Sequence, residues 1–345
     1  MPVLRAETAT RTYLTRQQER LRHPLEGPPP TLKQRFFPFG FPVDVFTNSA
    51  AVLKMLEEMW RPFTARFPKD PIRCDIVVEE SSETRCPPPP AYHLLMPLVT
   101  TICDGNNFSV VDVERSTVRT HITEAALRYP LFVRQHLLTA AYSCICTRYV
   151  TPIHGACVSW NSRGILLCGD SGAGKSTLAY ACAHQGWIYT SDDASYLMNE
   201  ETSRRVTGNC HQVRLRPESA SLFPEISPLK LTARIAGKPS VEVPTNTMKD
   251  VTTSPTADVD YVIFLNRNHN GPAALVSSSP VAARESMGAT LYGIPRMLDI
   301  QYRAIDRLLT APVYELRYQT LDDAIRLLRW LAEEGENAER FIAAR

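Results

Sequence analysis

GILLCGDSGAGKSTLAYACAHQGWIYTSDD, Gly164 to Asp193, is the stretch that decides the fold of this chain. It contains the pattern G-x-x-x-x-G-K-[ST], which is filled by Gly169, Gly174, Lys175 and Ser176. The apolar run 165–168 predicts a buried strand before the loop, and the small and apolar residues after it predict a helix over 175–185. This strand–loop–helix setting is the context that a phosphate-binding loop requires, so we favour that interpretation over a plain glycine-rich turn.

The loop residues have the chemistry that a polyphosphate requires. Glycines let the backbone approach the phosphates, and successive N–H groups at a helix N-terminus form a concave anion site. We expect Lys175 to reach the β- and γ-phosphates of ATP or another nucleoside triphosphate, and the Ser176 hydroxyl to hold Mg²⁺. The predicted nucleotide-binding residues are Gly169, Asp170, Ser171, Gly172, Ala173, Gly174, Lys175, Ser176 and Thr177.

Two aspartates follow the loop after only one helix. Gly186 is a natural helix C-cap, residues 187–191 predict a second strand, and a right-handed crossover makes the two strands parallel. Both strands then end at one edge of the sheet, which places Asp192 and Asp193 beside the phosphates. Neighbouring residues point to opposite sides of a strand, so we expect one, assigned here as Asp192, to hold Mg²⁺ with Ser176 and the other to accept a proton. The reverse assignment stays open, as does a solvated Asp-Asp turn.

The run His154-Gly155-Ala156, a turn at 161–164, the sequence GDSGAGKS and the Asp-Asp pair together resemble the catalytic domain of the HPr kinase/phosphorylase family. The resemblance covers about residues 151–197. It implies a phosphoenolpyruvate-carboxykinase-like fold, a homo-oligomer, and a kinase that transfers the γ-phosphate of ATP to a serine hydroxyl. It also identifies His154 as an active-site histidine, whereas a histidine in an apolar strand is otherwise more often a core residue.

Two departures from the family pattern concern the acceptor and the metal. The family's loop ends GKSE, and Thr177 stands here in place of the acidic residue. The region 212–217 reads QVRLRP and lacks the family's downstream arginine-and-glycine motif. We therefore expect a divergent relative, whose acceptor serine belongs to a carrier protein, a peptide or a free small molecule.

Arginines beyond the loop are further candidates for the site. Arg214 and Arg216 alternate with apolar residues, which places both on one side of a predicted strand, where they could clamp phosphate. Two solvent-facing arginines at a sheet edge fit this pattern equally well. Arg267 follows the apolar strand 261–265 and is a third candidate.

Composition bounds the class of protein. The chain has 345 residues, of which 44% are hydrophobic and 21% charged, so a packed globular core is expected. A formal net charge of +2 argues neither for nucleic acid nor for a membrane surface as partner, and no apolar run is long enough to span a membrane. The nine scattered cysteines include no C-x-x-C pair, which favours a reduced, cytoplasmic location over a zinc site or disulfides.

We expect an α/β (mixed α+β) protein with three regions: a flexible N-terminal arm (1–35), a small α+β domain (36–150) and the phosphate-loop catalytic domain (151–345). The small domain is predicted to hold a helix (50–59), a strand (72–78), a hairpin (108–122) and one long helix (131–149). The catalytic domain is predicted to hold a hairpin (158–166), helices at 280–291, 298–309 and 321–333, and a strand at 313–318.

Two other functions fit parts of the pattern. Thr177 and the extra N-terminal region are compatible with a module that binds nucleotide and a protein partner without transferring phosphate. A decarboxylating carboxykinase of the related fold would require a cluster for a small dicarboxylate and a second metal, and the sequence shows none.

Overall fold

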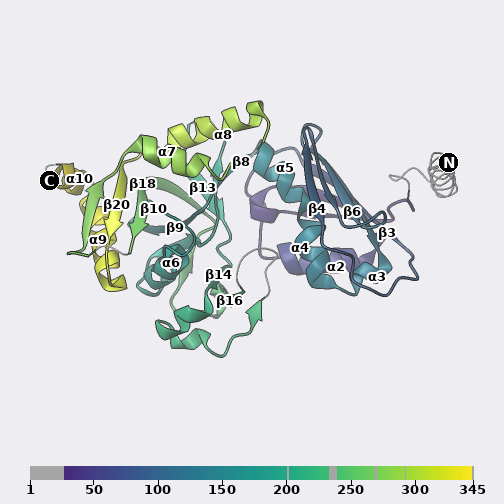
Figure 1. The fold of residues 1–345 in the computed structure, drawn as a ribbon, viewed down its shortest axis with the longest axis horizontal. Helices are drawn as coiled ribbons and strands as arrows, with labels where there is room; N and C mark the ends of the chain where they lie inside the picture. Colours follow the sequence, from purple (N-terminus) through teal and green to yellow (C-terminus); the bar gives the residue numbers. More distant parts are fainter. Residues whose placement is uncertain (1–26, 200–201, 233–238, 268–269, 292, 344–345) are drawn as a thin grey trace, which may run out of the picture. The chain divides into compact units, whose positions relative to one another are not determined.

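The computed structural model describes residues 27–199, 202–232, 239–267, 270–291 and 293–343 (Figure 1). The chain divides into two compact units. Unit 1 comprises the described residues up to Phe36, Pro42–Arg61 and Phe67–Ala141, and unit 2 comprises Phe37–Phe41, Pro62–Arg66 and the chain from Tyr142 onward. The chain crosses into unit 2 for the last time between Ala141 and Tyr142, whereas the sequence predicts the start of the catalytic domain at Thr151.

Unit 1 is built on one mixed sheet with the strand order β1-β2-β3-β7-β6-β5-β4. Its parallel neighbours are β2 with β3 and β3 with β7, and its other pairs are antiparallel. The strands are β1 (Leu32–Phe36), β2 (Val43–Thr47), β3 (Ile72–Glu79), β4 (Ala91–Leu95), β5 (Leu98–Ile102), β6 (Phe108–Asp112) and β7 (Thr117–Thr123). The helices are α2 (Ala50–Trp60), α3 (Glu124–Leu127), α4 (Pro130–His136) and the 3₁₀ turn η2 (Leu138–Ala140).

Two predictions for the first part of the chain are wrong. The flexible arm was expected to reach residue 35, but β1 begins at Leu32 and pairs with β2 as an edge strand; residues 1–26 of the predicted arm lie outside the described residues. The single helix expected over 131–149 is broken into α4, η2 and α5 (Ala141–Arg148). Near the break the hydroxyls of Thr139 and Ser109 donate to the carbonyls of Gln135 and Leu137, so side chains take acceptors that a continuous helix would use.

Unit 2 contains a larger mixed sheet with the strand order β17-β11-β9-β10-β18-β13-β12-β8, extended by β20 on β18 and β19 on β20. Its strands are β8 (Val150–Ile153), β9 (Gly155–Trp160), β10 (Arg163–Cys168), β11 (Ile188–Ser191), β12 (Ser195–Met198), β13 (Arg205–Gly208), β17 (Thr252–Thr253), β18 (Thr256–Asn266), β19 (Ala274–Ser277) and β20 (Val313–Arg317). A small antiparallel sheet of order β14-β16-β15 joins it, with β14 (Gln212–Leu215), β15 (Leu231–Thr232) and β16 (Ser240–Pro244).

Helices cover both faces of the large sheet (Figure 1). Along β10, Ile165 and Leu167 pack with α6 (Lys175–His184) and α9 (Leu321–Glu334), whereas Leu166 and Cys168 pack with α7 (Pro280–Gly288) and α8 (Pro295–Leu308). This burial on both faces explains why β10 reads as a continuous apolar run. The remaining elements of unit 2 are α10 (Glu336–Ala343) and the 3₁₀ turns η1 (Pro38–Gly40), η3 (Pro217–Ser221), η4 (Pro224–Ile226) and η5 (Thr245–Thr247).

The molecule is therefore a mixed α/β protein with several sheets. Within the described residues, no helix combines the length and the apolar character needed to cross a membrane. All nine cysteines are free thiols.

Candidate functional site

The strands β10 and β11 end at the same edge of the large sheet, as the crossover predicts. They are not neighbours, because β9 lies between them and pairs antiparallel with both. Gly155 at the start of β9 pairs with Cys168 at the end of β10, and Cys157 pairs with Ser191 at the end of β11. The residue before β9, His154, therefore lies between the phosphate loop and the Asp-Asp pair.

The loop has the backbone conformation that its glycines allow. Gly169, Gly172 and Gly174 have φ of 138°, 94° and 98°, in the region that L side chains rarely adopt. A Cβ on Gly172 would have no atom within 4 Å, so this glycine faces open space. Gly174 is the N-cap of α6, and Gly186, with φ of 85°, follows its other end.

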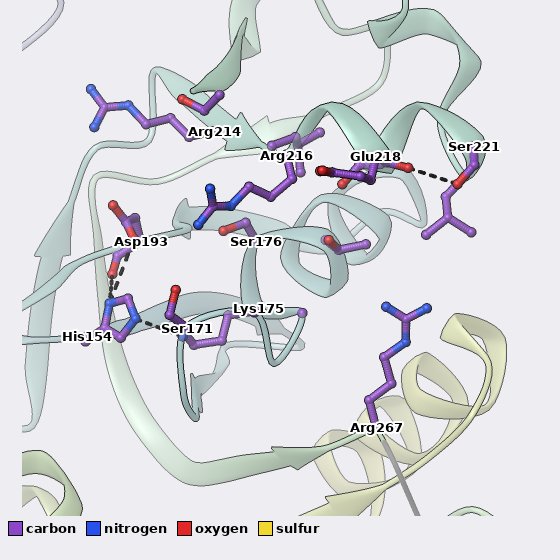
Figure 2. Close-up of a pocket in the computed structure, with 17 residues that line it drawn as sticks. His154, Ser171, Lys175, Ser176, Asp193, Arg214, Arg216, Glu218, Ser221 and Arg267 are labelled. Carbon is purple, nitrogen blue, oxygen red and sulfur yellow. Dashed lines mark hydrogen bonds and ion pairs between the residues drawn. The ribbon is translucent and has the colours of Figure 1, made fainter. Parts of the chain in front are cut away.

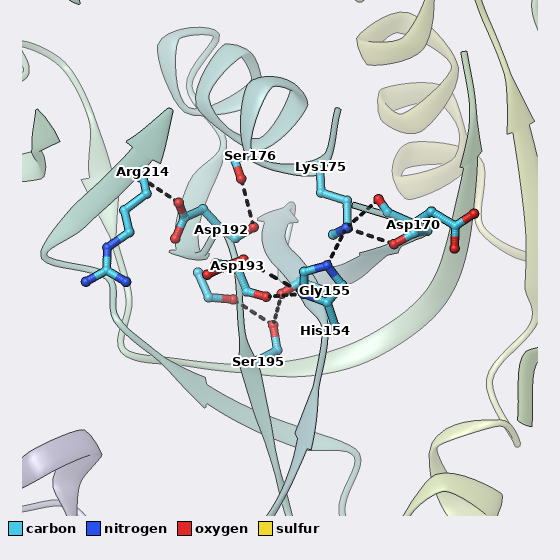
Figure 3. A network of polar contacts seen from close by, with 11 residues as sticks. His154, Gly155, Asp170, Lys175, Ser176, Asp192, Asp193, Ser195 and Arg214 are labelled. Carbon is cyan, nitrogen blue, oxygen red and sulfur yellow. Dashed lines mark hydrogen bonds and ion pairs between the residues drawn. The ribbon is translucent and has the colours of Figure 1, made fainter. Parts of the chain in front are cut away.

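The lysine of the loop is buried and fully hydrogen-bonded (Figure 3). The Lys175 Nζ donates to the carbonyl oxygens of Gly169 (2.8 Å) and Asp170 (3.0 Å) and to Nε2 of His154 (3.0 Å). Burial lowers the pKa of Lys175, and the nearby Cys168, Asp193 and Asp170 oppose this shift. The Lys175 ammonium group is therefore held by hydrogen bonds within the protein, next to the loop where we expect it to bind phosphate.

The contacts of His154 define its tautomer. An ammonium group can only donate, so Nε2 of His154 accepts from Lys175 and the ring proton is on Nδ1. Nδ1 lies 3.1 Å from the carbonyl oxygen of Asp193 and 3.8 Å from its Oδ1. The His154 side chain is 40% exposed, so it is not the core histidine that its apolar strand would suggest.

The two aspartates have different surroundings. Asp193 faces the pocket with a side chain that is 38% exposed. Asp192 is 5% exposed, and its Oδ2 accepts from the backbone N–H of Arg214 at 2.6 Å. Burial raises the pKa of Asp192 to about 6, and the charge of Asp193 adds to the shift, while the Arg214 N–H opposes it. The two carboxylates thus differ in burial and in hydrogen bonding, and the division of roles between them stays a prediction.

Ser176 connects the loop to the acidic strand end. Its hydroxyl donates to the backbone carbonyl of Asp192 at 3.2 Å, so a metal ion held by this hydroxyl would lie next to the Asp-Asp pair. Among the described residues, no group of three or more His, Cys, Asp and Glu side chains is arranged to hold a metal ion.

The loop opens into a pocket of about 420 Å³ (Figure 2). Loop residues, His154 and Asp193 form one part of its wall, and the segment from Arg214 to Leu222 forms another. Figure 2 shows Arg216 extending into the space near Ser176 and Asp193, whereas the guanidinium of Arg214 is turned away from it. Arg214 pairs instead with Glu242 on β16, Nε to Oε1 at 3.2 Å. The Nη1 atom of Arg216 is buried and has no hydrogen-bond partner among the described residues.

The structure therefore brings most of the predicted site residues to one pocket. The lining includes Ser171, Gly172, Gly174, Lys175, Ser176, Thr177, His154, Asp193, Arg214, Arg216 and Arg267. Gly169, Asp170, Ala173 and Asp192 do not line it, although all four lie beside residues that do. Sequence reasoning missed the other lining residues, which are Leu215, Glu218, Ser219, Ser221, Leu222 and Ser240. Ser240 is carried to the pocket by the pairing of β16 with β14, and no local motif signals it.

Comparisons with known proteins find similarity among solved structures only. No protein-family model matches the chain, and no curated protein matches it. Among solved structures, the chain is similar to the Hpr(Ser) kinase/phosphatase from Coxiella burnetii, with 14% sequence identity and a TM-score of 0.30. The similarity covers 55% of this chain and 97% of that chain.

Proposed function

We propose that this protein is a Mg²⁺-dependent kinase that transfers the γ-phosphate of ATP to a serine hydroxyl. The proposal depends on one juxtaposition: a glycine-rich anion cradle with its lysine, and an acid–histidine pair, line the same pocket. The finer fold assignment, a phosphoenolpyruvate-carboxykinase-like catalytic domain that forms a homo-oligomer, belongs to the same proposal.

The residues present fit a nucleoside triphosphate with Mg²⁺. Gly172 leaves open space at the loop, and the buried Nη1 of Arg216 lacks the partner that a phosphate oxygen would supply. The Ser176 hydroxyl is the protein ligand that we assign to Mg²⁺, with phosphate oxygens and water completing the shell. When bound, Mg²⁺ would neutralise charge on the phosphates.

Asp193 is the group that we assign as proton acceptor. Its carboxylate takes the proton of the serine hydroxyl as the serine oxygen bonds to the γ-phosphorus and the bond to the β–γ bridging oxygen breaks, releasing ADP. Lys175 and Arg216 stabilise the charge that moves to the phosphate oxygens. The Nδ1–H of His154 donates to the carbonyl of Asp193 and so holds this residue beside the loop.

The direct test is transfer of labelled phosphate from ATP by the full chain in Mg²⁺. The acceptors are a serine-containing peptide library, small carrier proteins and free serine. We expect Asp193→Asn to lose about 10²–10⁴-fold in turnover while its Kd for nucleotide changes little. Asp250→Asn is the matched control, because Asp250 is exposed and has a positive φ that asparagine also adopts.

The outcome separates two functions. Asp193→Asn transferring phosphate as fast as the unmodified protein would remove the mechanism. Stoichiometric nucleotide binding without transfer to any acceptor would favour the alternative, a nucleotide-sensing module, and Thr177 in the pocket wall is the observation that keeps this alternative.

A further inference from the structure

Asp192 is attached to a different sheet from the one that carries it. It follows β11 of the large sheet, and its Oδ2 accepts from the N–H of Arg214 on β14, a strand of the small sheet. The contact is short, 2.6 Å, and the aspartate is only 5% exposed, so water competes little for it. The carboxylate is thus used to join two sheets and does not line the pocket.

A second bond from β11 reaches the same strand. The hydroxyl of Tyr189, a fully buried residue, donates to the carbonyl of Gln212 at 3.0 Å. Tyr189 and Asp192 therefore hold β14 at Gln212 and Arg214, two positions on the same strand. These two bonds fix the end of β14 relative to the end of β11.

The segment that these bonds fix carries Arg216 into the pocket. Arg216 is two residues beyond Arg214, and its Nη1 is buried without a partner among the described residues. The side chain of Arg214 is held on the small sheet by Glu242. Its backbone N–H is held by Asp192, as Figure 3 shows, so the strand end is tied on both sides. Loss of the Arg214 N–H contact would remove one of these two ties, two residues before Arg216.

We propose that Asp192 is a positioning residue, which holds Arg216 over the phosphate loop, and that Asp193 alone of the pair meets the substrates. The inference rests on the proposed nucleotide site and refines it. Asp192 has a structural role, and Asp193 has the chemical role. The bond from the Ser176 hydroxyl goes to the backbone carbonyl of Asp192, so substitutions of the Asp192 side chain leave that acceptor in place.

Asparagine and alanine at position 192 distinguish positioning from metal binding or proton transfer. An asparagine side-chain oxygen can still accept from the Arg214 N–H, but it is no base, and without a charge it is a weaker ligand for a metal ion than a carboxylate. Alanine offers no acceptor at all and leaves the N–H of Arg214 buried without one. A positioning role therefore predicts that asparagine restores both the nucleotide Kd and turnover. A base role predicts no recovery of turnover, and a metal role predicts that Asp192→Asn needs a higher Mg²⁺ concentration than the unmodified protein.

The experiment measures the Kd of a fluorescent ATP analogue with Mg²⁺, together with kcat and KM, on the full chain. We expect Asp192→Ala to raise the Kd about tenfold, the cost of one hydrogen bond to a charged group, and Arg216→Ala to raise it similarly. Asp192→Asn should bind at least about fivefold more tightly than Asp192→Ala. The double variant Asp192→Ala/Arg216→Ala should bind no more weakly than Arg216→Ala alone, because both changes remove the same contact.

Three results would overturn the inference: loss of transfer in Asp192→Asn as complete as in Asp193→Asn, no rescue of the Kd by asparagine, or additive effects in the double variant. If Asp192→Ala fails to fold, Tyr189→Phe can be used instead, because it removes the other bond to β14. The inference then requires Tyr189→Phe to raise the Kd by less than tenfold, and the double variant with Arg216→Ala to bind no more weakly than Arg216→Ala alone. The Kd series remains informative even if the unmodified protein transfers phosphate to no acceptor. Failure of the kinase proposal and failure of this inference are therefore separately visible.

Discussion

The two units each contain a strand–helix–strand crossover, and only the crossover of unit 2 has a glycine-rich turn between its first strand and its helix. In unit 1, β2, α2 and β3 form the crossover, and the two strands pair directly in parallel. In unit 2, β10, α6 and β11 form it, and β9 is inserted between the strands. The strand–helix–strand crossover is shared, and the two units differ in the turn between strand and helix and in the strand order.

In unit 1 the turn is closed by its own side chains. Asn48 accepts from the backbone N–H of Val78 and donates to the carbonyl of Val78, both at 2.8 Å. The N–H of Ser49 bonds to the hydroxyl of Thr47. These polar side chains satisfy backbone groups next to the turn, which runs from Thr47 to Ala50 without a glycine.

The largest expected effect exploits the lysines of the two crossover helices. Replacing Lys175 by Met removes the cation expected at the phosphates, so we predict a loss of about 10²–10³-fold in kcat/KM for phosphoryl transfer. Lys54→Met in α2 is the matched control, because this exposed lysine belongs to the closed crossover. Equal kcat/KM values for the two variants would contradict the functional difference that we infer between the crossovers.

The next effect concerns the closed turn. Asn48→Ala leaves the N–H and the carbonyl of Val78 without their partner, which should lower the free energy of unfolding by about 1–3 kcal/mol. Urea unfolding of the full chain, followed by circular dichroism, measures this loss. The Kd for nucleotide should not change, and a weakened Kd would show that the turn of unit 1 contributes to the site.

A smaller effect is expected from one glycine of the open loop. Gly172→Ala places a Cβ in open space but at a φ of 94°, so its cost is backbone strain of about 1 kcal/mol, or roughly a fivefold rise in the nucleotide Kd. Gly105→Ala is the control, because its Cβ would also meet nothing within 4 Å and its φ lies outside the left-handed range. Calorimetric titration with ATP and Mg²⁺ compares them, and equal Kd values would mean that the loop conformation is not needed.

The smallest effect concerns how stability depends on pH, and it compares the buried His121 with the exposed His93. His121 in β7 is 3% exposed and stacks on Phe108, and burial lowers its pKa, with Arg119 adding to the shift and Glu79 opposing it. Below about pH 6.5 the unfolded chain then binds more protons than the native one, so stability falls as the pH drops. We expect urea midpoints between pH 7 and 5 to fall less for His121→Phe than for the unmodified protein. The exposed His93→Gln should follow the unmodified protein, and a His121→Phe series of equal slope would contradict the prediction.

Local signals predicted the elements around the loop. The glycine spacing, the apolar run before it and Gly186 after it locate β10 and α6 to within a residue at their shared turn. The hairpin between β9 and β10 was confirmed as well, because Asn161 and Ser162 adopt the positive φ values, 48° and 63°, that a tight hairpin turn requires. In these cases a short stretch of chain carries the whole physical reason.

Long-range pairing was not predictable in the same way. Nothing near Ser240 or Glu218 indicates a pocket, because Ser240 arrives through the register of β16 on β14 and Glu218 through the turn η3. The environments of Asp192 and Asp193 also differ for a reason that lies 22 residues away, at the N–H of Arg214. Likewise, the carbonyl of Leu137, at the break between α4 and α5, accepts from Ser109, which belongs to a strand of the sheet 28 residues away.

The resting position of Lys175 has a consequence for which anions can occupy the loop. All three of its N–H donors are already in use, so a ligand gains from this cation only by supplying oxygens that replace two carbonyls and an imidazole nitrogen. A single phosphate that stays at the helix N-terminus does not replace these acceptors of Lys175. A longer phosphate chain would then be selected because its oxygens can replace the present acceptors of Lys175. This selectivity would require no contact with the sugar or the base of a nucleotide.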